Sequence, residues 1–225
     1  MVPEKIIQFP EPRVQNGGGG HAVVNGDGVK YFTETEIKLI RRTARNRAEL
    51  AMMKKRVTAV REWMAIDLIS STGLRVTEAS NVRCGDIHLE YGRSEIYVRF
   101  GKGSKSRTVQ MPQSLKKHLK KYMEWKKDMG EATGYDDHLF MGQKGHWTRH
   151  AIQFLVKKYL KKLGLYENGK SVHALRHSYA VQLYRKEKDL RAVQKQLGHS
   201  SIQTTQIYAD VTIEDIQQQI KNFWG

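Results

Sequence analysis

The chain has 225 residues, with 39 Lys plus Arg against 23 Asp plus Glu, which gives a formal net charge of +16. Its hydrophobic content of 39% is enough for a core and excludes a disordered polyelectrolyte. No run approaches the roughly 18 apolar residues that a membrane span needs, and no basic and then apolar leader is visible at the N-terminus. A single cysteine, Cys84, excludes an internal disulfide and a cysteine zinc cage. We therefore expect a cytoplasmic protein in a reducing compartment, with no membrane partner and with a polyanion such as nucleic acid as its partner.

The first 29 residues differ from the rest of the chain. They carry two basic and three acidic side chains, so the remaining residues hold an excess of +17. They also contain three of the four prolines and an unbroken run of four glycines over 17–20. Such a run loses too much backbone entropy to join a helix and offers no side chain to a sheet. Residues 1–29 are therefore predicted to be a flexible tail or linker.

Regular structure is predicted to start at Thr33. Thr33 and Glu36 form a capping box, in which the hydroxyl and the carboxylate satisfy the first free N–H groups of a helix. The apolar spacing predicts a second helix over 48–71, for which Gly73 would be the left-handed C-terminal cap. A short helix is expected over 77–82.

The pattern then changes to strand periodicity. Residues 95–100 and 107–111 alternate apolar and polar side chains, the stretch 101–106 between them predicts a hairpin loop, and residues 87–89 are a candidate third strand. After Pro112 the apolar periodicity returns to that of helices, which are predicted over 114–129, 148–163, 171–185, 189–197, 204–208 and 212–224. The predicted fold class is therefore mainly α with a small antiparallel β-sheet, an α+β fold.

Three common catalytic arrangements find little support. Nine histidines are present, but there is no HExxH segment, and His173 and His177 at i, i+4 lack a placed third ligand. Gly101-Lys102-Gly103 lacks the GxxxxGK[ST] form of a nucleotide loop and lies between two predicted strands. A Ser/His/Asp triad stays open on composition, although no GxSxG elbow is present. We therefore expect no metal and no cofactor.

A cationic constellation is the stronger signal. Its members are basic side chains at turns, a helix face and a hairpin tip, followed by a tyrosine: Arg75, Lys102, His173, Arg176, His199 and Tyr208. Two arginines, a lysine and two histidines are suited to hold a phosphate whose charge grows in a transition state. A tyrosine beside them is a candidate nucleophile, because nearby cations favour its phenolate. Singly, each residue also has a structural explanation, such as an ion pair between Arg75 and Glu78, a helix cap at His173 or core packing of Tyr208.

Five short segments carry this constellation in one order along the chain. They read TGLRVTE at 72–78, GKGSKSR at 101–107, HALRH at 173–177, LGH at 197–199 and TTQIY at 204–208. Together they resemble the tyrosine recombinases, also called phage integrases, which are marked by TGLRxxE, GKGxKxR, HxLRH, LGH and TTxxY. The resemblance spans about residues 31–208 and implies a tyrosine recombinase catalytic-domain fold over 30–210.

The resemblance implies a DNA strand transferase that needs neither metal nor ATP. Tyr208 would attack a DNA phosphodiester, form a 3′-phosphotyrosyl bond and release a 5′-hydroxyl. Arg75 and Arg176 would hold the non-bridging oxygens, because planar guanidinium forks suit the phosphorane better than lysine does. Lys102 would protonate the leaving 5′-oxygen, with Lys105 as the fallback if the hairpin register differs.

The same resemblance gives supporting roles to the histidines and one glutamate. His173 would serve as acid/base for Tyr208, and His199 would hydrogen-bond the phosphate. Glu78 would orient the first arginine without reacting, and His177 is expected in the same surrounding layer.

Lysines recur in pairs on the predicted helices, for example Lys126 with Lys127. A single pair is explained by a solvated face, but their number beside the charge excess favours a surface that faces DNA phosphates. The residues expected to contact DNA are Lys105, Arg107, Lys116, Lys120, Lys157 and Lys161.

The chain departs from the family pattern at its two ends. Most members place a helical core-binding domain before the catalytic domain, whereas here only the 29-residue segment precedes it, so the usual N-terminal domain is expected to be absent. The chain is then either a fragment of a longer integrase or a minimal form. At the other end, the helix predicted within 211–225 has an apolar stripe over Ile213, Ile216, Ile220 and Phe223. It either packs on its own domain or, as in the family, docks on a neighbouring protomer in a dimer or tetramer on DNA.

The expected function is that of a nucleoid-associated, site-specific recombinase or integrase of duplex DNA, for integration or excision of a mobile element. Two alternatives are DNA relaxation of the type IB topoisomerase kind and a non-catalytic DNA-binding regulator on the same scaffold. The short chain and the spacing from LGH to the tyrosine favour the integrases over the topoisomerases. The presence of every candidate catalytic residue argues against the regulator.

Overall fold

The first helix begins at the predicted capping box. In the computed structural model, which describes residues 29–99 and 106–210, helix α1 spans Glu34–Met53. The Thr33 hydroxyl accepts the backbone N–H of Glu36 at 3.2 Å, and the Glu36 carboxylate accepts the N–H of Thr33 at 2.7 Å. Residues 1–28 of the predicted tail, the hairpin tip with Lys102 and Lys105, and the last predicted helix lie outside the described residues.

The helix predicted over 48–71 is wrong in its first part. Helix α1 continues to Met53, and a separate helix, α2, spans Val57–Thr72. The chain turns between them at Lys55, whose φ of 50° lies in the left-handed region. No glycine or proline marks this turn in the sequence, so no local signal gave its position. The other end of α2 is as predicted, because Gly73 closes it with a φ of 66°.

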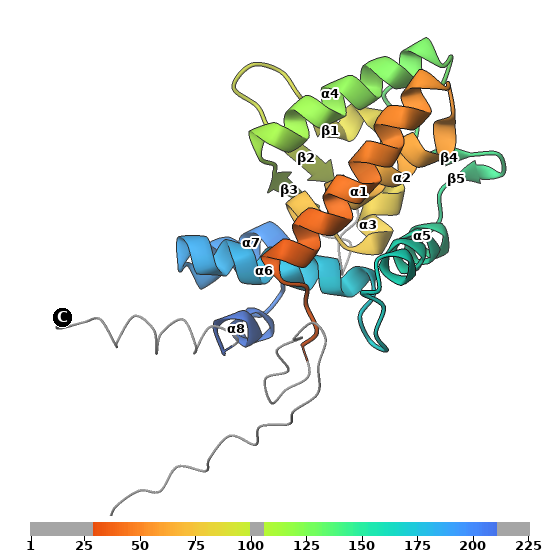
Figure 1. Cartoon of the computed structure of the whole chain (residues 1–225). Coiled ribbons are helices and arrows are strands. Elements are labelled where there is room, and N and C mark those ends of the chain that lie inside the picture. The colour runs from red at the N-terminus through yellow and green to blue at the C-terminus, as the bar shows by residue number, and fades with distance from the viewer. Residues whose placement is uncertain (1–28, 100–105, 211–225) are drawn as a thin grey trace, which may run out of the picture.

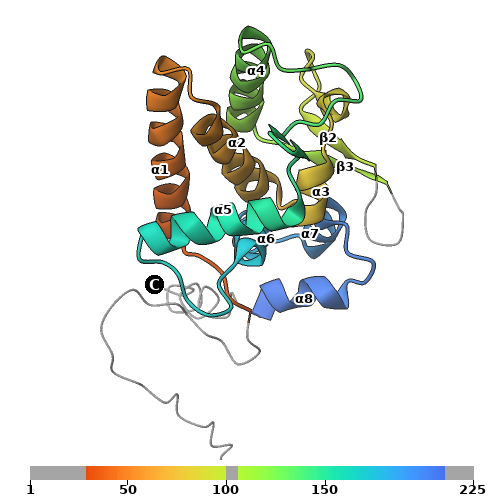
Figure 2. The same cartoon turned by 90° about the vertical axis from the view of Figure 1, so that its right-hand side faces the viewer.

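The later helices lie within two residues of their predicted ends. They are α3 (Val76–Asn81), α4 (Gln113–Asp128), α5 (Arg149–Lys162), α6 (Val172–Glu187), α7 (Leu190–Leu197) and α8 (Gln203–Asp210). In Figure 1, α4 lies at one end of the molecule and α6, α7 and α8 lie at the other. Figure 2 shows α5 crossing the front of the molecule, with α1 on one side and α3 on the other.

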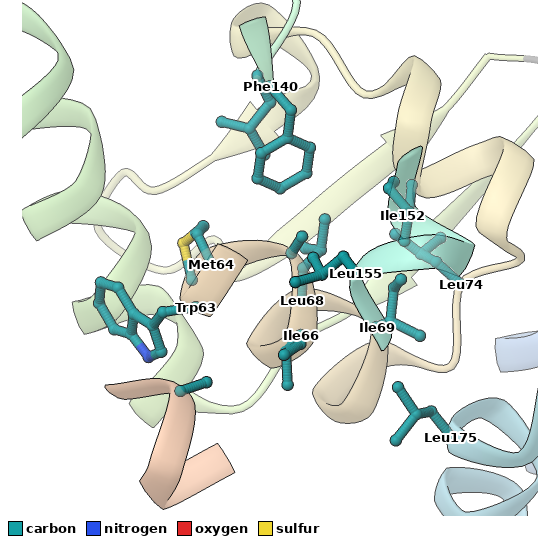
Figure 3. Close-up of a cluster of buried hydrophobic side chains, with 14 of the residues drawn as sticks. Trp63, Met64, Ile66, Leu68, Ile69, Leu74, Phe140, Ile152, Leu155 and Leu175 are labelled. Carbon is teal, nitrogen blue, oxygen red and sulfur yellow. The ribbon is translucent and has the colours of Figure 1, made fainter. Parts of the chain in front are cut away.

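Helix α2 is buried on nearly every side, and α1, α4, α5 and α6 pack around it. Figure 3 shows the apolar cluster that results, in which Met64 and Leu68 of α2 lie among Phe140, Leu155 of α5 and Leu175 of α6. Full burial of each such side chain stabilises the fold by about 1.5–3 kcal/mol. This core fixes the turn after α2, from which the first arginine of the candidate site projects.

Two carboxylates are buried inside this apolar helix, and side chains of the surrounding helices neutralise them. Arg47, Lys158 and Tyr159 contact Glu62, and Arg41 and His118 contact Asp67. Burial acts to raise the pKa of Asp67, but the contacts with His118 and Arg41 outweigh it and lower that pKa. Part of the positive charge of the chain is therefore used inside the fold, because a buried carboxylate without a partner would cost several kcal/mol.

The three predicted strands form one antiparallel sheet in the order β1-β2-β3. Ile96 pairs with Val109 across the ladder and both side chains are fully buried, so the alternation predicted the core face correctly. The strands are β1 (Ile87–His88), β2 (Glu95–Val98) and β3 (Arg107–Gln110). With these strands, the predicted class of a mainly helical fold with a small antiparallel sheet is confirmed.

Two further short elements were not predicted. A 3-10 helix, η1 (Cys84–Asp86), leads into β1, and a second antiparallel pair consists of β4 (Met141–Gly142) and β5 (Gly145–His146). Two-residue strands that contain glycine give no alternation for a sequence pattern to detect.

The paired lysines were expected on an exposed surface, whether solvated or facing DNA phosphates, and this expectation is wrong at Lys126. Its side chain is fully buried, and its Nζ donates to the Glu131 carboxylate at 3.0 Å and to the Leu139 carbonyl at 3.3 Å. Lys126 lies four residues after the buried Tyr122, on the inner face of α4, whereas Lys127 is exposed. Over the described part of the chain, the helices are too short or too polar to cross a membrane.

Candidate active site

Arg75 projects from the turn between α2 and α3, where Gly73 redirects the chain. Its Nη1 donates to the Glu78 carboxylate at 2.9 Å, and its backbone N–H donates to the second carboxylate oxygen at 2.8 Å. Its Nη2 donates to the carbonyl of Gly198 at 3.2 Å. The ion pair with Glu78 that the sequence suggested is therefore present, and it holds the guanidinium toward the end of α7.

Arg176 lies one turn into α6 and is almost completely buried. Its Nη1 donates to the Gly73 carbonyl at 2.6 Å, and its Nη2 donates to the Leu197 carbonyl at 2.9 Å. Burial and the neighbouring Arg75 lower the pKa of Arg176 to about 10, so the side chain keeps its charge at neutral pH. Carbonyls at two helix ends thus hold both arginines, in the position where the helix dipole favours a cation.

Glu78 is the counter-ion of the site. Its side chain is 2% exposed, and both its oxygens accept from the guanidinium of Arg107, at 2.7 and 2.9 Å. Burial acts to raise the pKa of Glu78, but the contacts with Arg107 and Arg75 outweigh it and lower that pKa to about 2. Arg107, which was predicted to contact DNA, thus forms a bidentate pair with Glu78, and its contact with DNA stays a prediction.

Tyr208 lies in α8 with only 1% of its surface exposed, packed beside Leu197 and Val181. Its hydroxyl is 2.9 Å from Nδ1 of His177. Burial raises the pKa of Tyr208, and Arg176 and Arg75 lower it by less, so the hydroxyl is a phenol at neutral pH. The nearby arginines do favour the phenolate, as expected, but desolvation outweighs them in this state.

The three histidines of the motifs occupy different environments. Burial, together with Arg176, lowers the pKa of His177 and of His199 to about 4, so both rings are neutral at pH 7. His199 Nδ1 lies 3.0 Å from the Thr205 hydroxyl, and its ring stacks 6.2 Å from that of Tyr208. His173 is exposed in the first turn of α6. The structure therefore places His177 against the tyrosine hydroxyl, in the position that the resemblance implied for His173.

The sequence did not identify two further contributors. Thr205, the second threonine of the TTQIY segment, orients His199 through its hydroxyl. The carbonyls of Leu197 and Gly198 orient both arginines, and only the LGH motif itself marked that turn. Within residues 29–99 and 106–210, no three His, Cys, Asp or Glu side chains are grouped closely enough to hold a metal ion.

Four of the lysines that were predicted to contact DNA belong to the described helices α4 and α5. Lys116 and Lys120 belong to α4, at the opposite end of the molecule from α6 to α8 (Figure 1), and Lys116 Nζ donates to the carbonyls of Glu90 and Arg93. Lys157 and Lys161 are exposed on α5, and their Nζ atoms lie 5.1 and 5.4 Å from the Tyr166 ring centroid. The contact of these four lysines with DNA stays a prediction.

Comparisons with known proteins found a family model, curated relatives and solved structures that are similar to this chain. A family model described as the phage integrase family matches residues 30–214. The tyrosine recombinase XerA of Thermococcus kodakarensis is 35% identical over 161 residues, which cover 72% of this chain and 55% of that protein. The crystal structure of a XerA recombinase aligns with a TM-score of 0.69 at 28% identity, over 89% of this chain and 66% of that one.

A second solved structure contains DNA. The XerH site-specific recombinase, bound to a palindromic difH substrate in a post-cleavage complex, aligns with a TM-score of 0.68 at 26% identity. The alignment covers 87% of this chain and 53% of that one. The chain spans about half the length of the curated relatives it matches.

Proposed function

Because the chain belongs to the phage integrase family, we propose that it is the catalytic domain of a site-specific DNA recombinase. It cleaves and rejoins duplex DNA through a 3′-phosphotyrosyl intermediate, for the integration or excision of a mobile element. The observation that carries this proposal is the Tyr208 hydroxyl, held by His177 beside two arginines that are themselves fixed by carbonyls. The DNA in the XerH complex, a protein of the same fold, supports duplex DNA as the partner.

The two arginines hold the scissile phosphate. A guanidinium has five N–H donors, and Arg176 uses one on the carbonyl of Gly73 and one on that of Leu197, which leaves donors for the phosphate oxygens. Because the carbonyls already fix the side-chain rotamers, little conformational entropy is lost when the phosphate binds. The positive charges then stabilise the charge that develops on the pentacoordinate phosphorus.

His177 takes the proton of the nucleophile. As the bond from the Tyr208 oxygen to phosphorus forms, the hydroxyl proton passes to His177 Nδ1 and the bond to the 5′-oxygen breaks. Lys102 supplies the proton to that 5′-oxygen. The negative phosphate raises the pKa of His177 from its value of about 4 in the free protein, which makes the ring a better base when DNA is bound.

The remaining residues assist binding and assembly. His173, exposed at the start of α6, and His199, beside the tyrosine ring, donate to the phosphate. The apolar stripe within 211–225 docks on a neighbouring protomer, so that cleavage depends on assembly on DNA. The energy of the cleaved bond is kept in the phosphotyrosine, so that rejoining requires neither metal nor ATP.

Trapping of the covalent intermediate tests the function. The full chain is incubated in EDTA with a pool of nicked suicide duplexes of randomised sequence, and adducts are separated on a denaturing gel and sequenced. We expect an adduct for the unmodified chain and none for Tyr208→Phe. Tyr166→Phe, which changes a partly exposed tyrosine outside the cluster, is the matched control and keeps the adduct.

Three results would contradict parts of the proposal. An adduct that survives Tyr208→Phe rules out this nucleophile, and a strict requirement for a divalent metal rules out the mechanism. Relaxation of supercoiled DNA without any exchange of strands between duplexes assigns the chain to the type IB topoisomerase class instead.

A further inference from the structure

Glu78, the counter-ion of the candidate active site, also lines a separate pocket of about 270 Å³. The pocket is bounded by the end of α3, η1, β2 and the β4–β5 hairpin. Four basic side chains line it. Arg83 precedes η1, Arg99 follows β2, His138 precedes β4 and His146 belongs to β5. None of them belongs to the recombinase motifs, and the proposed mechanism does not use them.

One exposed carboxylate bridges the two arginines of this pocket. Oδ1 of Asp136 lies 2.5 Å from Nη1 of Arg83 and 3.4 Å from Nη1 of Arg99. The Asp136 side chain is 70% exposed, so water competes for its charge and the two ion pairs add little stability. Asp86 differs, because its buried carboxylate binds Arg99 Nε at 2.6 Å and caps the Arg83 N–H at 2.9 Å.

Two polar atoms at the pocket have no partner within the described residues. Nη2 of Arg99 and Nδ1 of His138 are buried and make no hydrogen bond. An unpaired buried donor is unfavourable, and an incoming acceptor would remove that cost. The ring of His138 stacks on that of His146 at 4.2 Å with an angle of 12° between the planes, so both imidazoles are held in place beside Arg83 and Arg99.

We propose that this pocket binds a backbone phosphate of the DNA, which replaces Asp136 between Arg83 and Arg99. The inference rests on the proposed function and extends it to a second phosphate-binding site. One phosphodiester charge exchanged for one carboxylate leaves the local charge balance unchanged, so no arginine becomes uncompensated. Along one DNA strand a phosphate recurs every 3.4 Å of helix axis. A DNA strand bound at the active site therefore brings further phosphates to the neighbouring surface, where Glu78 separates the active site from this pocket. In the free protein Asp136 thus holds the two arginines, and DNA displaces it from them.

DNA binding as a function of salt tests this assignment. Fluorescence anisotropy is measured with the full chain and a labelled duplex, in a Tyr208→Phe background that prevents covalent trapping. We expect Arg83→Gln and Arg99→Gln each to weaken binding and to reduce the slope of log affinity against log salt by about one. The matched control is Arg45→Gln, because Arg45 is also paired with an exposed carboxylate but lies on α1, across the molecule from β2 (Figure 2).

Removal of the Asp136 carboxylate is expected to strengthen DNA binding, an effect that misfolding of a variant would not produce. Asp136→Asn frees both arginines and is expected to tighten DNA binding several-fold, whereas the control Glu49→Gln on α1 leaves it unchanged. Binding by Asp136→Asn that is equal to or weaker than that of the unmodified chain overturns the inference. So do arginine variants whose salt slope matches that of Arg45→Gln.

Two further readouts identify the ligand and separate this inference from the proposed function. If inorganic phosphate perturbs the NMR signals of His138 and His146 while the arginine variants bind DNA normally, the pocket takes a free anion and the assignment to DNA fails. If the Tyr208 adduct forms but the pocket variants bind DNA unchanged, only this inference fails. If the variants change DNA binding as expected but no adduct forms, the proposed function fails and the pocket stands.

Discussion

Glu78 neutralises the arginines of the candidate site from a buried position. Arg75 and Arg107 bind its two oxygens directly, and Arg176 Nη1 lies 4.0 Å away. We expect Glu78→Gln to lower the free energy of unfolding by about 3–5 kcal/mol, because loss of one partner leaves buried charges uncompensated. Urea denaturation measures the change, and Glu49→Gln, which removes an exposed ion pair, shifts it by less than about 0.5 kcal/mol. Equal effects of the two substitutions would contradict the role given to Glu78.

A substitution at His177 can distinguish its hydrogen bond to the Tyr208 hydroxyl from its proposed role as proton acceptor. In His177→Asn the side-chain amide can still bond the tyrosine hydroxyl but cannot take its proton at neutral pH. We expect the single-turnover rate of adduct formation to fall by about 10²–10⁴-fold, with DNA affinity unchanged and with loss of one limb of the pH–rate profile.

His173→Asn is the comparison for that substitution, because His173 is exposed. It is expected to weaken DNA binding while the pH dependence of the adduct rate is retained. A pH profile that changes in His173→Asn and not in His177→Asn would restore the role that the resemblance implied for His173.

At the scale of elements, the close approach of Gly198 to Arg107 couples the end of α7 to the buried ion pair. A Cβ on Gly198 would lie 2.7 Å from Cδ of Arg107, and the φ of 66° is itself unfavourable for alanine. We expect Gly198→Ala to destabilise the fold by about 2–4 kcal/mol, through backbone strain of about 1 kcal/mol and displacement of Arg107 from Glu78.

Gly164 offers a matched control for that prediction. It has a φ of 68° at the end of α5, but a Cβ there would meet nothing within 4 Å. Gly164→Ala therefore incurs only the backbone strain, and urea denaturation of the two variants isolates the contact with Arg107. A difference of less than about 0.5 kcal/mol would show that Arg107 relocates without cost.

The elements that sequence predicted well are those with strong local signals. The capping box at Thr33 and the glycine turn at Gly73 were found because their chemistry is confined to a few neighbouring residues. The turn at Lys55 was missed because no glycine or proline marks it, and the burial of Lys126 because it depends on how the segment with Glu131 and Leu139 folds back on α4. No local pattern records which face of a helix a later element will cover.

The same distinction separates what was and was not predicted at the site. The motifs named the residues that come together, since Arg75, Arg176, His199 and Tyr208 form one cluster. The sequence did not predict their contacts or protonation states. Arg107 binds Glu78, and desolvation keeps Tyr208 protonated. These outcomes depend on burial, which neither spacing nor residue type determines.

For the whole molecule, the buried histidines predict how stability depends on pH. His177 and His199 have pKa values of about 4 in the fold against 6.5 ordinarily, so the unfolded chain binds more protons between these limits. Stability should therefore fall as pH decreases from 6.5 toward 4, and the low pKa of Glu78 extends the loss from 4.5 toward 2.

Urea denaturation at several pH values between 6.5 and 4 measures this dependence. The double variant His177→Gln/His199→Gln removes both titrating rings and is expected to flatten the curve in that range. His150→Gln, which changes an exposed histidine on α5, should leave the curve as it is. A curve with equal slope in the double variant would mean that other groups cause the loss.

The carbonyl contacts of the two arginines have a consequence for the timing of activity. Arg176 binds a carbonyl 103 residues earlier in the chain, and Arg75 binds one 123 residues later. A polypeptide growing on the ribosome therefore cannot complete the arginine pair until the end of α7 has been made, because Leu197 and Gly198 supply carbonyls to both side chains. Under the proposed function, the ability to cleave DNA is then among the last properties that the folding chain acquires.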